Sequence, residues 1–164
     1  MIDTAYFAGG CFWCITPAFD MTPGVRKVVS GYSGGVEDSP TYEDVKYQRT
    51  GHRETIRVDY NPEKVGYDQL LEIFLNGVDP FDEGGQFIDR GHSYTLAIYY
   101  CNEAQQEADQ AALATLEKAS GRKPAIALEP FTGFWPAEEY HQDYYKKNPE
   151  AFRKELIESG RIKE

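Results

Sequence analysis

The chain has 164 residues, of which 41% are hydrophobic and 14% aromatic, a composition typical of one packed globular domain. The formal net charge of −10 disfavours the phosphate attraction on which nucleic-acid binding depends, so nucleic acid is excluded as a partner. We find neither an apolar run of the roughly 20 residues that a membrane helix needs nor a signal peptide, and the low, odd count of three cysteines favours a reducing cytoplasm over a secreted disulfide framework.

Hydrophobic periodicity and turn residues predict alternating strands and helices along the chain. Strands are expected at residues 2–8, 25–32, 53–60, 94–100 and 125–128. Helices are expected at residues 11–20, 41–45, 67–76 and 103–119 and in the segment after residue 136, with long loops at 79–93 and 131–136. No repeat, linker or low-complexity tract is visible, so residues 1–164 are expected to form a single domain. The order β-α-β-β-α-β, then α-β and a helical tail, is that of the split βαβ motif. We therefore expect an α+β fold, a two-layer ferredoxin-like plait with a mixed or antiparallel sheet and helices packed on it.

Cys11 follows a predicted strand and the Gly9-Gly10 turn, at the point where a helix is expected to begin. The N–H groups and dipole of a helix N-terminus favour an anion, so this placement predicts a depressed thiol pKa and a reactive thiolate. An isolated cysteine is more often an inert buried thiol. The strand, Gly-Gly turn and helix start favour a chemical role here.

Cys14 lies three residues after Cys11, which is the spacing of a redox pair or of half a metal site. Structural zinc needs four ligands, and only Cys101 and three scattered histidines remain. We therefore expect no metal site, and a redox role for the pair stays open.

Glu54 breaks the alternation of charged and apolar residues in the strand predicted at 53–60. It is in phase with Ile56 and Val58, so the pleat of the strand directs it toward the core. A carboxylate there is costly unless it is paired or used, and burial would raise its pKa toward neutrality, as a general acid requires. A structural alternative is a salt bridge to Arg53, Arg57 or Lys46.

Phe12 and Trp13 stand between the two cysteines. Neighbouring helical residues point about 100° apart, so the two rings cannot share one direction. They either fill the core or form the wall of an apolar pocket beside the thiol. Tyr42 and Tyr94 could supply phenolic donors, although most of the twelve tyrosines must be structural. The residues alone thus indicate a thiol-based enzyme with an apolar pocket and an acid.

Gly10-Cys11-Phe12-Trp13 resembles the nucleophile motif of the A-type methionine sulfoxide reductases, the peptide-methionine (S)-S-oxide reductases. Further segments resemble that family's motifs in the same order along the chain, at residues 28–35, 40–45, 51–54, 84–87, 89–91, 93–94, 137–142 and 147–149. The resemblance therefore extends over nearly the whole chain.

This resemblance implies a role for each matching residue. Cys11 matches the catalytic cysteine, and Glu54 matches the acid that protonates the sulfoxide oxygen. Tyr42 and Tyr94 match the tyrosines that hold this oxygen. Phe12 and Trp13 match the aromatic residues that receive the methyl group of the oxidised methionine. Asp89 matches an acidic position around the substrate. The resemblance also implies a plait fold, no cofactor, methionine sulfoxide as the substrate, either free or in oxidised proteins, and thioredoxin or another dithiol as the external reductant.

The chain departs from many family members in its cysteines. Cys14 stands where many members have a small residue, and residues 160–164 contain none of the resolving cysteines that many members carry in a C-terminal tail. We expect Cys14, one helical turn from Cys11, to resolve the oxidised thiol; the alternative is direct reduction of Cys11 by an external thiol. Tyr94 and Cys101 lie on one predicted strand about 23 Å apart. If Tyr94 touches the substrate, Cys101 lies beyond the roughly 7 Å limit for a disulfide with Cys11.

Two other functions are compatible with parts of the sequence. A thioredoxin-like dithiol exchanger would use Cys11 and Cys14, but it has no need of the carboxylate and the tyrosines. A module that binds oxidised or methionine-rich peptides would use the aromatic pocket alone, and its effect would survive a Cys11→Ser substitution.

Overall fold

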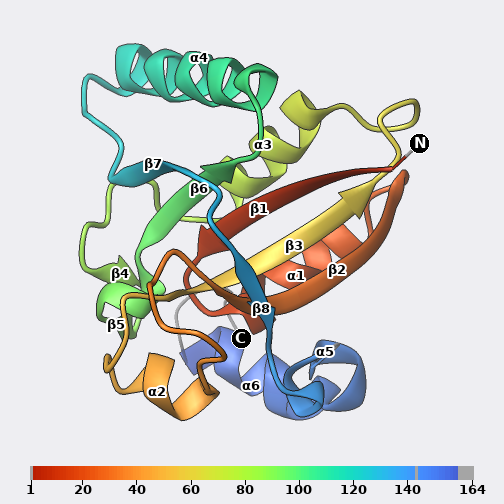
Figure 1. Cartoon of the computed structure of the whole chain (residues 1–164), viewed down its shortest axis with the longest axis vertical. Helices are drawn as coiled ribbons and strands as arrows, with labels where there is room; N and C mark the ends of the chain where they lie inside the picture. Colours follow the sequence, from red (N-terminus) through yellow and green to blue (C-terminus); the bar gives the residue numbers. More distant parts are fainter. Residues whose placement is uncertain (1, 143, 159–164) are drawn as a thin grey trace.

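The computed structural model describes residues 2–142 and 144–158 (Figure 1). Its strands are β1 (Asp3–Gly9), β2 (Val25–Ser33), β3 (Arg53–Tyr60), β4 (Gly85–Gln86), β5 (Asp89–Arg90), β6 (Leu96–Tyr100), β7 (Ile126–Pro130) and β8 (Phe134–Pro136). Its helices are α1 (Phe12–Asp20), α2 (Tyr42–Lys46), α3 (Tyr67–Asn76), α4 (Glu103–Ser120), α5 (Tyr144–Lys147) and α6 (Pro149–Glu158), with short 3₁₀ turns η1 (His92–Tyr94) and η2 (Glu139–His141).

Six strands form one curled sheet in the order β7-β6-β1-β3-β2-β8. Neighbouring strands are antiparallel except β6 and β7, which are parallel. The prediction of a mixed sheet with helices packed on it is therefore confirmed. The central strands β1 and β3 bring the start of α1 beside the start of β3, because they run in opposite directions.

Helices α1 and α3 cover one face of this sheet, as Figure 1 shows. Phe7 of β1 stacks on Phe19 of α1 and Phe74 of α3, with ring centroids 5.4 and 5.0 Å apart. All three side chains are buried, and burying each contributes about 1.5–3 kcal/mol of transfer free energy. This packing fixes the first turn of α1 against the sheet.

The face of β3 that points away from α1 and α3 carries polar side chains, and its first residues are buried. Arg53 Nη1 donates to Tyr99 Oη at 3.1 Å and to Glu129 Oε2 at 2.9 Å, and its Nε donates to Thr95 Oγ1 at 2.8 Å. Arg53 and Thr55 are both buried. The prediction of a half-exposed strand is therefore wrong for its first residues, and the Arg53 contacts tie the end of β3 that carries Glu54 to β6 and β7.

Three predicted segments differ from the structure. Tyr94 ends the 3₁₀ turn η1 and the strand starts only at Leu96, while the predicted loops contain the hairpin β4–β5 and the edge strand β8. β8 pairs with β2, about a hundred residues away in the chain, and such a partner is invisible to local periodicity. The C-terminal residues 160–164 lie outside the described residues.

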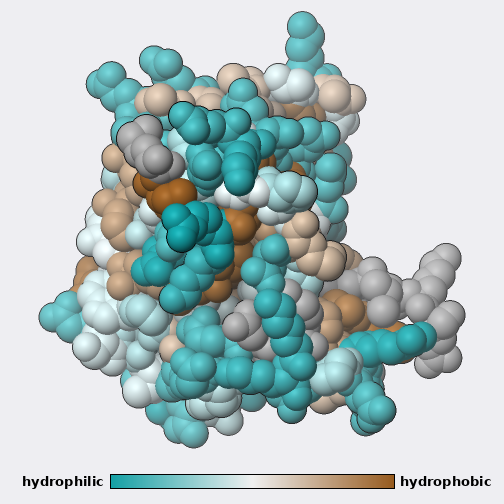
Figure 2. Space-filling model, turned by 90° about the vertical axis from the view of Figure 1, so that its right-hand side faces the viewer, coloured by the Kyte–Doolittle hydropathy of each residue, from teal (hydrophilic) through white to brown (hydrophobic). Residues whose placement is uncertain are grey.

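Figure 2 shows the face on the side of the N-terminus. Hydrophilic side chains cover most of it, and small hydrophobic areas lie between them. Among the described residues, no helix is long and apolar enough to cross a membrane.

Candidate active site

Cys11 lies between β1 and α1, at the N-cap of the helix. Gly10 has a φ of +84°, which a side chain would strain, and it turns the chain sharply between strand and helix. Gly9 packs so closely on Ile15 and Phe74 that an added Cβ would meet them at 3.0 and 3.2 Å. The two glycines thus place the half-buried Cys11 thiol where the helix begins.

Glu54 lies beside that helix start. Its side chain is 1% exposed, and its Oε1 accepts a hydrogen bond from the backbone N–H of Phe12 at 3.1 Å. The prediction that Glu54 points inward is confirmed. The nearby cations are engaged elsewhere, since Arg53 pairs with Glu129 and Arg57 pairs with Asp59, so the structural alternative of a Glu54 salt bridge with either arginine is wrong.

Burial raises the pKa of Glu54 to about 8, helped by the negative charges of Asp89 and Cys14. Hydrogen bonds from Phe12 N–H and the Tyr94 hydroxyl oppose this increase of the pKa. Glu54 Oε2 makes no hydrogen bond that meets normal geometric criteria within the described part of the chain. At neutral pH the carboxyl is therefore mostly protonated, with a proton ready to donate.

The Cys11 thiol has a raised pKa, so the expectation of a depressed value is wrong. The hydrogen bond with the Cys14 thiol raises it first, followed by burial and by electrostatic interactions with Cys14, Glu54 and Asp89, whose ionised forms would repel a thiolate. These acidic neighbours outweigh the helix N-terminus, whose first N–H already serves Glu54. At neutral pH the Cys11 thiol and the Glu54 carboxyl therefore both retain their protons.

The two candidate tyrosines reach the site from different elements. Tyr94 is 8% exposed, and its pKa is raised by burial and by the charge of Glu54, so its hydroxyl stays a donor. Tyr42 begins α2, which Thr41 caps by accepting from Asp44 N–H at 3.2 Å. The Tyr42 backbone N–H donates to Glu138 Oε2 at 3.1 Å. Figure 1 shows α2 and the hairpin β4–β5 at this same end of the sheet.

Phe12 and Trp13 have different environments, so the two adjacent rings have different roles. Phe12 is completely buried and packs on Tyr32, with centroids 5.9 Å apart. Trp13 is half-buried and stacks on Tyr42 at 6.3 Å. Phe12 is thus a core residue that supports the wall, whereas Trp13 and Tyr42 form the wall's accessible surface.

His141 belongs to this wall, a role that was not predicted from the sequence. It is 1% exposed, and its Nδ1 accepts a hydrogen bond from Trp13 Nε1 at 3.0 Å. Burial lowers the pKa of His141 to about 4, so the ring is neutral, and its Nε2 makes no hydrogen bond within residues 2–142 and 144–158. Trp13 and His141 are 128 positions apart, so no local pattern could have paired them.

The segment carrying His141 is held by two polar side chains. Glu138 accepts from the Tyr32 hydroxyl at 2.8 Å. Gln142 bonds both backbone groups of Ser30, at 2.9 Å each. These bonds fasten the C-terminal segment to β2, and so they fix the wall beside Cys11.

Asp89 lies in β5 and is half-buried. Its charge raises the pKa of Cys11, Glu54 and Tyr94. The structure thus brings all eight predicted site residues to one end of the sheet. Cys101 lies past the opposite end of β6, because Leu96 pairs with Gly9 whereas Tyr99 pairs with Tyr6. Within the described residues no disulfide joins the three cysteines, and no cluster of His, Cys, Asp or Glu side chains suits a metal ion.

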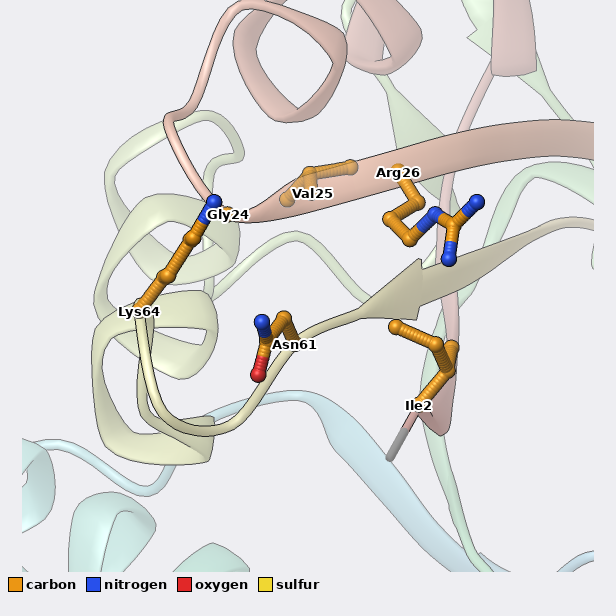
Figure 3. A pocket seen from close by; sticks show the side chains of 6 residues that line it. All are labelled: Ile2, Gly24, Val25, Arg26, Asn61 and Lys64. Carbon is orange, nitrogen blue, oxygen red and sulfur yellow. The ribbon is translucent and has the colours of Figure 1, made fainter.

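A cavity of about 390 Å³ lies at the other end of the sheet (Figure 3). It is lined by Ile2, Gly24, Val25, Arg26, Asn61 and Lys64. These residues include no thiol and no carboxylic acid, and Asn61 follows the end of β3 that is remote from Glu54. The cavity is separate from the site around Cys11.

The fold and this site define a thiol-based enzyme in which a buried acid and an aromatic wall surround the nucleophile. The family model described as "Peptide methionine sulfoxide reductase" matches residues 3–164. The chain belongs to this family.

Similar proteins extend over nearly the same length. Peptide methionine sulfoxide reductase MsrA of Bacillus licheniformis is 46% identical over 161 residues, covering 97% of this chain and 89% of the relative. The MsrA of Bacillus subtilis is 45% identical, covering 97% and 91%. The crystal structure of reduced Mxr1 from Saccharomyces cerevisiae has a TM-score of 0.84 at 29% identity, covering 91% of this chain and 87% of Mxr1.

Proposed function

We propose that this chain reduces methionine (S)-sulfoxide, free or in oxidised proteins, to methionine. The observation that carries the proposal is the buried Glu54 carboxyl bonded to Phe12 N–H beside the Cys11 thiol. The family assignment supports the substrate, and the selectivity for the S form rests on the sequence resemblance alone. The activity would repair proteins damaged by oxidation.

In the proposed first step, Cys11 sulfur attacks the sulfoxide sulfur. Glu54 protonates the departing oxygen, while the Tyr42 and Tyr94 hydroxyls stabilise its developing negative charge. The attack forms a sulfur–sulfur bond, and the protonated oxygen leaves the substrate sulfur. This oxygen then bonds to Cys11 sulfur as the sulfur–sulfur bond breaks, which releases methionine and leaves Cys11 as a sulfenic acid. Because the raised pKa keeps Cys11 as a thiol, its proton must leave as the sulfur attacks. Polarisation of the sulfoxide by the protonated Glu54 favours this loss.

In the proposed second step, the Cys14 thiol attacks the Cys11 sulfenic acid, forming a disulfide and releasing water. Cys14 N–H donates to Cys11 C=O at 3.0 Å, and the two thiols are hydrogen-bonded. An external dithiol then reduces the disulfide, so no cofactor is needed. We propose thioredoxin for this role, because the yeast relative Mxr1 has also been solved in complex with Trx2.

Two broader features are part of the same proposal. The strand order β6-β1-β3-β2, with every pair antiparallel, supports a ferredoxin-like plait, and residues 1–164 would act as a single domain. Three cysteines without a disulfide suit the reducing cytoplasm, where we place the protein.

The direct test is turnover of the separated S and R sulfoxides with thioredoxin as the reductant. We expect turnover of the S form only, and none by Cys11→Ser. Equal turnover of both forms would contradict the stereochemical claim, and an active Cys11→Ser variant would contradict the assigned nucleophile.

A further inference from the structure

The hairpin β4–β5 carries two large apolar residues at its tip. Gly85 pairs with Arg90 and Gln86 pairs with Asp89, so Phe87 and Ile88 alone form the turn. Two-residue turns favour glycine, asparagine and aspartate, because at least one position needs a positive φ. Phe87 has a φ of +55°, which is rare for a bulky residue. Local turn chemistry therefore does not account for these residues.

The tip is held rigidly. The Arg90 guanidinium donates two hydrogen bonds to the Asp82 carboxylate, at 2.6 and 2.7 Å. Gln86 is completely buried and forms two hydrogen bonds with the backbone of Asp79, at 2.8 and 2.9 Å. Despite this anchoring, Phe87 is 38% exposed and Ile88 is 62% exposed. Backbone strain and exposed apolar area that persist on a rigid element are typical of functional positions.

The tip lies at the edge of the active site. Asp89, the residue after Ile88, is close enough to raise the pKa of Cys11 and Glu54. The chain then turns directly into η1, where Tyr94 N–H donates to Gly91 C=O at 3.0 Å. The hairpin therefore adjoins the site where the oxidised methionine of a polypeptide would meet Cys11.

We propose that Phe87 and Ile88 bind the residues that flank methionine sulfoxide in an unfolded polypeptide, and that they favour apolar flanking side chains. The inference rests on the proposed function, and it specifies which polypeptide substrates the enzyme prefers. Because the hairpin backbone that presents these side chains is anchored, binding such flanks would order little additional backbone. Free methionine sulfoxide has no flanking residues, so its reduction does not depend on the tip.

The test compares three substrates: free methionine sulfoxide, a short peptide with leucine on both sides of it, and the same peptide with serine on both sides. Ile88→Ser should raise KM for the leucine-flanked peptide about threefold to tenfold, the effect of losing part of one apolar side chain's burial. Its kcat/KM for free methionine sulfoxide should be unchanged. Phe87→Gly, which accepts the positive φ, should act in the same direction.

Ile2→Ser is the matched control, because Ile2 is 39% exposed and lies at the opposite end of the sheet (Figure 3). It should leave all three substrates unaffected. An unchanged KM of Ile88→Ser for the leucine-flanked peptide would overturn the inference, and so would an equal loss of kcat/KM for all three substrates. In either case, turnover of free methionine sulfoxide by the wild-type enzyme would still support the proposed function. Failure of the wild-type enzyme on every substrate would contradict both.

Discussion

The backbone N–H of Phe12 and the Glu54 carboxylate oxygen lie 3.1 Å apart, although 42 positions separate the two residues in the chain. This bond places a buried acid at the first turn of the helix that Cys11 caps. The pairing of β1 with β3 makes it possible, because it aligns the end of one strand with the start of the other.

Glu54→Gln should keep this hydrogen bond, since the amide oxygen also accepts, but it removes the proton donor. We expect the reductase rate at neutral pH to fall by about 10²-fold or more, the usual scale for a positioned general acid. In the wild-type enzyme kcat/KM should decline as the pH rises through about 8, where Glu54 loses its proton. A variant with the wild-type rate, or with the same alkaline decline, would remove Glu54 from the mechanism.

The same substitution makes a prediction about stability. The pKa of Glu54 is raised to about 8 from its ordinary 4.5, so between these values the native state binds a proton that the unfolded state has lost. The contribution of this group to stability is complete below about pH 4.5 and is lost as the pH rises through about 8. The free energy of unfolding of Glu54→Gln should therefore exceed that of the wild type increasingly from pH 5 to pH 8, measured by urea denaturation. A difference independent of pH would contradict the raised pKa.

Trp13 and Phe12 offer a matched pair of adjacent rings. Trp13→Ala should raise KM for methionine sulfoxide with a small loss of stability, because the ring is half-buried on the pocket wall. Phe12→Ala should destabilise the protein by about 3–5 kcal/mol, the usual cost of emptying an aromatic core site. Steady-state kinetics and thermal unfolding distinguish the two effects. The reverse assignment of effects would place Trp13 in the core.

His141→Phe tests how Trp13 is oriented. The substitution keeps an aromatic ring but removes the acceptor of the Trp13 N–H bond. We expect KM to rise about threefold to tenfold, since losing one hydrogen bond costs about 1 kcal/mol, and Trp13 fluorescence should change. Unchanged KM and fluorescence would show that packing alone orients the indole.

Much of this site can be predicted from the sequence, but only where the features that indicate it are local or periodic. The phase of β3 indicates Glu54, and the Gly-Gly turn indicates Cys11. The role of His141 and the turn at Phe87 could not be predicted, because each depends on contacts between segments far apart in the chain. The pKa of Cys11 is predicted in the wrong direction, because the helix start is visible in the sequence whereas the crowding of Glu54, Asp89 and Cys14 around the thiol is not.

Cys14→Ser and Cys101→Ser distinguish the two possible resolving thiols. Cys101 lies past the far end of β6, and its N–H is bonded to Gln105 Oε1 at 2.8 Å. We expect Cys101→Ser to turn over normally with thioredoxin, and Cys14→Ser to stop after one cycle. Normal turnover by Cys14→Ser would show that an external thiol resolves Cys11 directly.

The central claim is that Cys11 takes the oxygen from methionine sulfoxide. Cys14→Ser protein, mixed with one equivalent of substrate and no reductant, measures this step directly by mass spectrometry in the presence of dimedone, which traps sulfenic acids. We predict one methionine released per chain and a dimedone adduct on Cys11 alone. Methionine release without an adduct on Cys11, or an adduct on Cys101 instead, would contradict the account.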